Sequence, residues 1–159
     1  MTQAEQANVP ERAMQKVIPP KLAEPYLAGH RDVIAGFVYR ATDCAGARPD
    51  QLFHMLDLGY PGTEFAPDAP EVIVMRWLAR DTDTYHVPHG PELGGDWRDR
   101  PPFRGNGYTS SNERMIPEFF TDPMPIPVGA EIYRVTASGE DFVARYDGRT
   151  WLRAVRQEG

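Results

Sequence analysis

Arg40, Glu140 and the hydroxyl-rich segment 107–111 are the residues whose types and positions could serve a chemical reaction. Arg40 ends an apolar segment, where a guanidinium is costly to desolvate unless it meets an anion or a carboxylate. Ser110 and Ser111 carry small hydroxyl groups that could orient a ribose or a neighbouring glutamate. Glu140 begins a predicted strand, which places a carboxylate at the edge of a sheet. These types could bind an anion and orient a ribose.

In this order the residues resemble the motif series of the mono-ADP-ribosyltransferases and related NAD-cleaving toxins. That family has an arginine ending its first strand, then an aromatic-Ser/Thr-x-Ser element, then a Glu-x-Glu or Gln-x-Glu motif. The resemblance implies that NAD is the substrate and that Arg40 holds its diphosphate. It implies that Tyr108, with Ser110 or Ser111, supports the binding site. Glu140 would be catalytic, because a carboxylate stabilises the positive charge that develops on the ribose as nicotinamide leaves.

Ser138 departs from the family pattern, because many members have Glu or Gln two residues before the catalytic glutamate. The departure implies NAD hydrolysis or an unusual acceptor rather than modification of arginine. A second interpretation, without chemistry, stays open. In it Arg40 pairs with a nearby acid, Ser110 caps a helix together with Glu113, and Glu140 is a solvated strand residue.

The segment 80–107 has no hydrophobic periodicity and contains many prolines and glycines. Such a long loop is typical of a functional lid or a disordered segment. As a lid it would cover the nucleotide, with Tyr85, Trp97 or Phe103 stacked on nicotinamide or adenine. The same aromatic residues equally suit a non-catalytic protein-binding domain, such as an immunity or adaptor protein. The sequence therefore leaves two kinds of partner open, a small-molecule nucleotide or a protein, and does not indicate an oligomeric state.

Metal ligation and thiol chemistry have little support in the sequence. His86, His89, Glu92 and Asp96 have metal-ligand types, but a proline between the two histidines places them in a loop, and no known ligand spacing matches. We expect solvated histidines and no metal. Cys44 is the single cysteine, which excludes an internal disulfide and predicts a small, semi-buried structural thiol.

The composition is that of an acidic globular domain, with 23 acidic residues against 17 Lys and Arg and a formal net charge of −6. This balance argues against a general nucleic-acid binder, which needs a positive footprint. No apolar run is long enough for a membrane span. The N-terminus lacks the features of a signal peptide, so we expect a cytoplasmic location, although a delivered toxin would look the same.

The elements that must position these residues predict an α+β domain. We expect residues 1–31 to form either a loosely docked polar arm or short helices, one of them around Glu11–Val17, and residues 32–159 to form one domain. Two further short helices are predicted, from Pro49 to Gly59 and from Ser110 to Phe120. The predicted strands are Val33–Arg40, Val72–Leu78, Ile132–Ala137, Phe142–Tyr146 and Thr150–Val155. The last three form a meander in a mainly antiparallel sheet.

Overall fold

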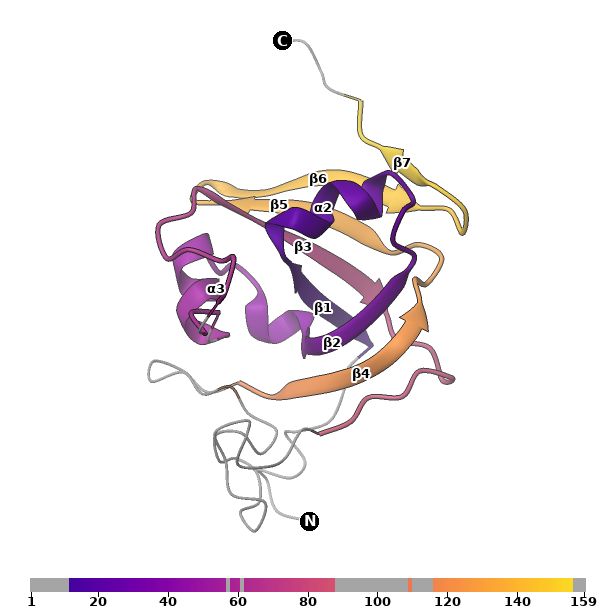
Figure 1. Cartoon of the computed structure of the whole chain (residues 1–159), viewed down its shortest axis with the longest axis horizontal. Helices are drawn as coiled ribbons and strands as arrows, with labels where there is room; N and C mark the ends of the chain where they lie inside the picture. Colours follow the sequence, from indigo (N-terminus) through magenta and orange to yellow (C-terminus); the bar gives the residue numbers. More distant parts are fainter. Residues whose placement is uncertain (1–11, 57, 61, 88–108, 110–115, 156–159) are drawn as a thin grey trace.

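The computed structural model describes residues 12–56, 58–60, 62–87, 109 and 116–155. Its main feature is a curved, seven-stranded sheet with the order β4-β2-β1-β3-β5-β6-β7, in which all pairings are antiparallel (Figure 1). The strands are β1 (Ala13–Ile18), β2 (Val33–Arg40), β3 (Glu71–Leu78), β4 (Glu118–Pro125), β5 (Glu131–Thr136), β6 (Gly139–Tyr146) and β7 (Trp151–Arg153). The described residues also form two short α-helices, and the sheet with these helices is consistent with an α+β or a mostly-β class.

The short helices begin at prolines, whose fixed φ angle suits the first turn of a helix. They are α2 (Pro20–Leu27) and α3 (Pro49–Met55), with a 3-10 turn, η1 (Ala41–Cys44), between them. At the start of α3, the backbone N–H of Arg48 donates to Oε1 of Gln51 at 2.8 Å. The helix predicted from Pro49 is confirmed, although it ends before Gly59. No helix in the described part of the chain is long and apolar enough to cross a membrane.

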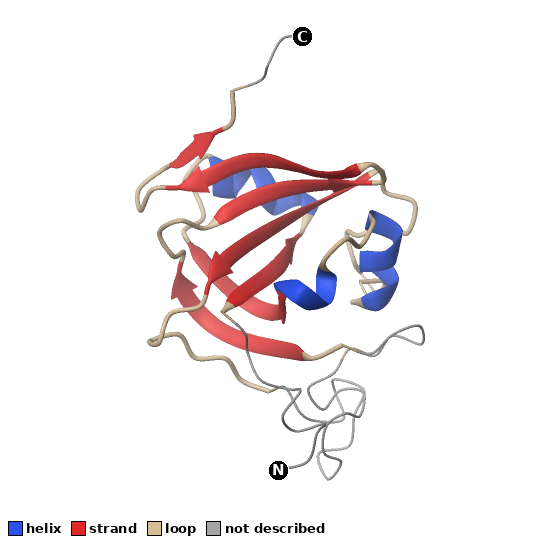
Figure 2. Ribbon diagram, turned by 180° about the vertical axis from the view of Figure 1, so that it is seen from behind, coloured by secondary structure: helices blue, strands red, loops and turns tan. Residues whose placement is uncertain are grey.

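Each face of the sheet carries its own apolar cluster, because successive residues of a strand point to opposite faces. On one face, Met14, Met75 and Ile132 pack with Tyr26 of α2. On the other face, strand residues such as Val74 pack against α3 and η1. Figure 2, seen from behind the view of Figure 1, shows α2 beyond the strands and α3 beside them. The two helices therefore cover different parts of the sheet.

The N-terminal segment differs from the sequence prediction. The helix expected around Glu11–Val17 is wrong over the described residues, because 13–18 form β1 near the middle of the sheet. This strand pairs with β3 from Ala13 to Ile18 and with β2 at Met14 and Gln15. Neighbouring strands on both sides form hydrogen bonds with the backbone N–H and C=O groups of β1. These hydrogen bonds outweigh the weak helical pattern of the local sequence. Residues expected to form an arm therefore contribute a strand and α2 to the body of the domain.

The helix predicted from Ser110 to Phe120 is also wrong where the structure describes it, because Phe119 and Phe120 lie in β4. This strand continues through Pro123 and Pro125, residues that lack a backbone donor. Proline is tolerated there because β4 lies at the edge of the sheet. The prolines were predicted to form an extended connector and instead lie within a paired strand.

The C-terminal meander is confirmed in β5, β6 and β7. Two tight turns join its strands, and each contains a glycine at positive φ, 137° at Gly139 and 104° at Gly148. Glycine adopts such angles without the steric penalty of a side chain. In the second turn, Oδ1 of Asp147 accepts the N–H groups of Arg149 and Thr150, each at 2.8 Å. The local turn chemistry was therefore sufficient to predict this part of the fold.

Candidate functional site

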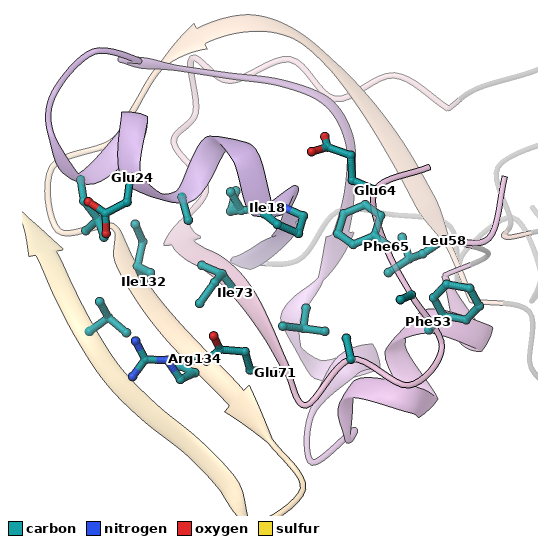
Figure 3. A pocket seen from close by; sticks show the side chains of 17 residues that line it. Ile18, Glu24, Phe53, Leu58, Glu64, Phe65, Glu71, Ile73, Ile132 and Arg134 are labelled. Carbon is teal, nitrogen blue, oxygen red and sulfur yellow. Dashed lines mark ion pairs between the residues drawn. The ribbon is translucent and has the colours of Figure 1, made fainter. Parts of the chain in front are cut away.

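A pocket of about 290 Å³ opens between α2, the segment after α3 and the sheet (Figure 3). Strands β1, β3 and β5 form its floor, so residues far apart in the sequence meet there. The residues that line it are Ile18, Pro20, Ala23, Glu24, Leu27, Phe53, Leu58, Glu64, Phe65, Ala66, Ala69, Glu71, Val72, Ile73, Ile132, Arg134 and Val143.

The walls of the pocket are mainly apolar. Ile18, Ile73 and Ile132 lie together on the sheet side, and Phe53 and Phe65 lie across from them (Figure 3). The backbone of Gly59 approaches the Phe53 ring so closely that a Cβ atom there would lie 2.9 Å from the ring's Cζ. Glycine at this position therefore permits the placement of Phe53 at the wall. The interior offers dispersion contacts and desolvation rather than charge.

Charged side chains occur around the apolar walls, and each carboxylate has a basic partner. Glu71 accepts from Arg134 at 2.6 Å, and Glu24 accepts from Arg153 at 3.3 Å. Glu64 lies 3.7 Å from the ammonium of Lys21. Because the acids and bases balance, this rim favours neither a cation nor an anion. A ligand that suits the pocket is mainly apolar.

A polar network lies on a different part of the sheet, centred on Arg76 of β3. The Arg76 guanidinium donates to both carboxylate oxygens of Glu140, at 2.7 and 3.1 Å, and to Oε1 of the buried Gln15 at 2.8 Å. It also lies 4.6 Å from the centre of the Tyr133 ring. Burial is the main cause that raises the pKa of Tyr133, and the negative charge of Glu131 raises it further. The positive charge of Arg76 acts in the opposite direction. The network stabilises a charge within an otherwise apolar strand.

The structure does not place Arg40 and Glu140 in one site. Arg40 ends β2 and donates to the carboxylate of Asp43 at 2.6 and 3.1 Å. Glu140 lies on β6 and pairs with Arg76, and three strands, β1, β3 and β5, separate β2 from β6. Tyr108, Ser110 and Ser111 lie outside the described residues. The NAD site inferred from the resemblance therefore stays a prediction.

Tyr85, predicted to stack on a nucleotide, is held against the core. Its hydroxyl accepts from Nε1 of Trp77 at 2.9 Å and donates to Asp83 at 3.1 Å, and burial is the main cause that raises its pKa to about 12. The described part of the loop also includes His86, whose Nε2 lies 3.0 Å from Oδ2 of Asp122. Trp97, Phe103, His89, Glu92 and Asp96 lie outside the described residues.

Metal and thiol chemistry find no further support in the described residues. No group of three or more His, Cys, Asp or Glu that could hold a metal ion occurs among them. Cys44 is buried in the cluster under α3, with 2% of its surface exposed. The thiol is therefore buried more deeply than the semi-buried position that the sequence predicts.

Sequence reasoning missed the pocket, Arg76 and Lys16. Arg76 had a detectable signal, since it is the one charged residue inside the apolar run Val72–Leu78. Lys16 similarly interrupts the run from Met14 to Ile18. A charge within such a run predicts a polar partner or a special environment. The pocket had no comparable signal, because its walls come from segments that meet only in the folded chain.

No protein-family model matches this chain, and no curated protein or solved structure matches it either.

Proposed function

We propose that this is a non-catalytic binding domain whose pocket beside α2 takes a small, mainly apolar group. The observation that carries the proposal is a cavity of about 290 Å³ with apolar walls and a charge-balanced rim. A dry cavity of about 150 Å³ is enough to hold benzene. The pocket therefore has room for a bicyclic ring or a medium-length alkyl chain. Such a group could belong to a free small molecule or to a side chain of a protein partner.

Binding is favoured over NAD cleavage because Arg40, implied to hold the NAD diphosphate, and Glu140, implied to be catalytic, each have another partner. Arg40 is paired with Asp43, and Glu140 is paired with Arg76. The strands of Arg40 and Glu140, β2 and β6, are not neighbours in the sheet. NAD cleavage stays a separate prediction, which is tested by NMR detection of free nicotinamide after incubation of the protein with NAD. Release that is lost in Glu140→Gln would support it and would contradict a purely non-catalytic role.

The binding proposal is tested with N-phenyl-1-naphthylamine, a neutral probe whose fluorescence rises in apolar surroundings. We expect saturable binding of the probe. If the natural occupant is a free molecule, octan-1-ol should displace the probe. Displacement by N-acetyl-tryptophanamide and not by octan-1-ol would indicate an aromatic side chain of a partner protein.

A matched pair of variants locates the bound probe. Ala23 of α2 lines the pocket, whereas Ala28 follows α2 and is exposed outside it. Ala23→Phe should fill the cavity and weaken probe binding at least about ten-fold, equivalent to about 1.4 kcal/mol. Ala28→Phe should leave binding unchanged. Equal affinity in Ala23→Phe, with an unchanged melting temperature, would place the probe elsewhere and overturn the proposal.

A further inference from the structure

Large apolar side chains are exposed together on β5, β6 and β7, at one end of the sheet (Figure 1). Phe142 of β6 is 42% exposed and Leu152 of β7 is 56% exposed. Tyr133 of β5 lies opposite Phe142, and the two rings meet edge to face with 5.9 Å between their centres. Apolar side chains that gather on one surface, rather than occurring singly, mark a place of association.

The registers of the strands show that these side chains share one face of the sheet. A cross-strand row, called here the charged row, consists of Arg76, Glu131, Arg145 and Leu152. Residues directly opposite one another point to the same side of a sheet. Tyr133 is two positions from Glu131 on β5, so it points to that side as well, together with its partner Phe142. The charged row and this aromatic pair form the open face of the sheet.

The charges on the open face balance. Arg145 donates to Glu131 at 3.4 Å. Arg76 lies over the Tyr133 ring and pairs with Glu140 at 2.7 Å. Two bases and two acids leave this region without net charge, whereas the whole chain carries −6. Two copies of the chain therefore repel one another less here than at an acidic surface.

A two-fold axis makes the open face complementary to itself. If the axis runs along the strands, between β5 and β6, the charged row of a second copy lies over that of the first in reverse order. Glu131 of each copy then faces Arg145 of the other, as a symmetric interface requires. In the next row, Tyr133 of each copy faces Phe142 of the other. Sheets that stack with aligned strands lie about 10 Å apart, a distance that such side chains bridge.

Arg145 can make this contact and keep its own pair. Its side chain is 61% exposed, and its bond to Glu131 is long. A guanidinium has several N–H donors, so it can meet a second carboxylate. The contact across the axis would join the two Glu131–Arg145 pairs into one network of four charged groups.

From these observations we propose that the chain forms a symmetric dimer, in which the open face of one copy packs against the open face of a second. The face offers few large apolar side chains, so we expect a transient contact with a dissociation constant on the order of 100 µM. Dilute protein is then monomeric. The interface is independent of the pocket beside α2, which neither the charged row nor the aromatic pair lines.

Sedimentation equilibrium of the whole chain tests the proposal, at low salt and at protein concentrations from about 5 to about 500 µM. We expect the average mass to rise with concentration, from that of one chain towards that of two. Glu131→Lys and Arg145→Glu should each weaken association at least about ten-fold, because each brings like charges together across the axis. A chain that stays monomeric throughout would overturn the dimer, and unchanged association of both variants would overturn the open face as its interface.

An equal mixture of the two variants tests the arrangement itself. The mixture should associate about as tightly as the unchanged chain, because the new lysine of one variant faces the new glutamate of the other. Melting temperatures of the separate variants show that each is folded before mixing. Two folded variants that do not recover association would overturn the two-fold arrangement.

Glu24→Lys is the matched control. It makes the same change of charge at another pair of a glutamate and an arginine, with Arg153, and it lies on α2, which packs on the opposite face. Association should therefore be nearly unchanged in this variant. If Glu24→Lys weakens association as much as Glu131→Lys, the net charge of the chain controls it and the proposed interface is overturned.

Discussion

Lys16 on β1 and Arg76 on β3 show two ways in which one sheet accommodates a charge. Gln15 pairs with Arg76 and Lys16 with Met75, so the two cations lie on adjacent strands but point to opposite faces. Arg76 meets a carboxylate, an amide oxygen and an aromatic ring. The ammonium of Lys16 donates to one carbonyl oxygen, that of Phe37, at 3.1 Å.

The comparison of Lys16 with Arg76 shows how neighbouring groups decide the role of a half-buried basic side chain. Polar partners make Arg76 part of the framework that joins β1, β3 and β6. Lys16 has no carboxylate partner among the residues that the structure describes, and burial is the main cause that lowers its pKa to about 8. Arg76 is therefore held by ionic and hydrogen-bonding partners, whereas burial destabilises the charged form of Lys16. The following substitutions test this contrast, from the largest expected effect to the smallest.

Arg76→Met should produce the largest loss of stability, about 3 kcal/mol in urea unfolding. The substitution leaves the buried amide oxygen of Gln15 without its donor and Glu140 without its partner. Arg145→Met is the matched control, since Arg145 pairs with Glu131 at 3.4 Å and its side chain is 61% exposed. That change should cost under about 0.5 kcal/mol. Equal losses in the two variants would show that the Arg76 network has no special structural role.

Lys16→Met should change how stability depends on pH. The pKa of Lys16 is lowered to about 8 in the folded state, against about 10.4 in an unfolded chain. Between these values the unfolded chain binds more protons, so the stability of the unmodified protein rises with pH. Subtracting the Lys16→Met curve should isolate a gain of about 2 kcal/mol between pH 7.5 and 9.5.

Urea unfolding at several pH values in this range measures the effect. The difference between the two proteins is informative because other groups, such as the Cys44 thiol, are common to both. Parallel curves would mean that folding leaves the pKa of Lys16 unchanged, which would contradict an effect of burial on this side chain.

Glu140→Gln should have the smallest effect on stability, about 1 kcal/mol. The amide keeps the shape of the side chain and can still accept from Arg76, but it loses the charge of the pair. The loss should shrink at high salt, since both side chains are partly exposed. The unfolding midpoints of the two proteins at low and high salt provide the measurement, and a salt-independent difference would argue against an ionic contribution.

The sequence predicted strands where the local pattern was strong. β2 and β3 are apolar runs rich in β-branched residues, and the meander has glycine turns at Gly139 and Gly148. Prediction from the sequence failed for β1 and β4, where Lys16 and Pro123 interrupt the apolar pattern. Those segments become strands because neighbouring strands supply hydrogen bonds, and strand propensity depends strongly on such context.

The candidate sites were harder to predict than the strands. Glu140 was singled out correctly as a carboxylate on a strand, but its partner Arg76 lies 64 positions away in the sequence. The pocket beside α2 joins residues from 18 to 143. Neither the Arg76–Glu140 pair nor the pocket produces a recognisable pattern in the local sequence, since contacts between distant segments depend on strand order and register.

The sequence by itself therefore determined the antiparallel character, the C-terminal meander and the chemical types available for a site. The tertiary structure alone decided which of these types meet: Arg76 with Glu140, and Arg40 with Asp43. The physical reason is that periodicity and turn chemistry act over a few residues. Burial, pairing and the resulting protonation state depend instead on neighbours that only folding brings together.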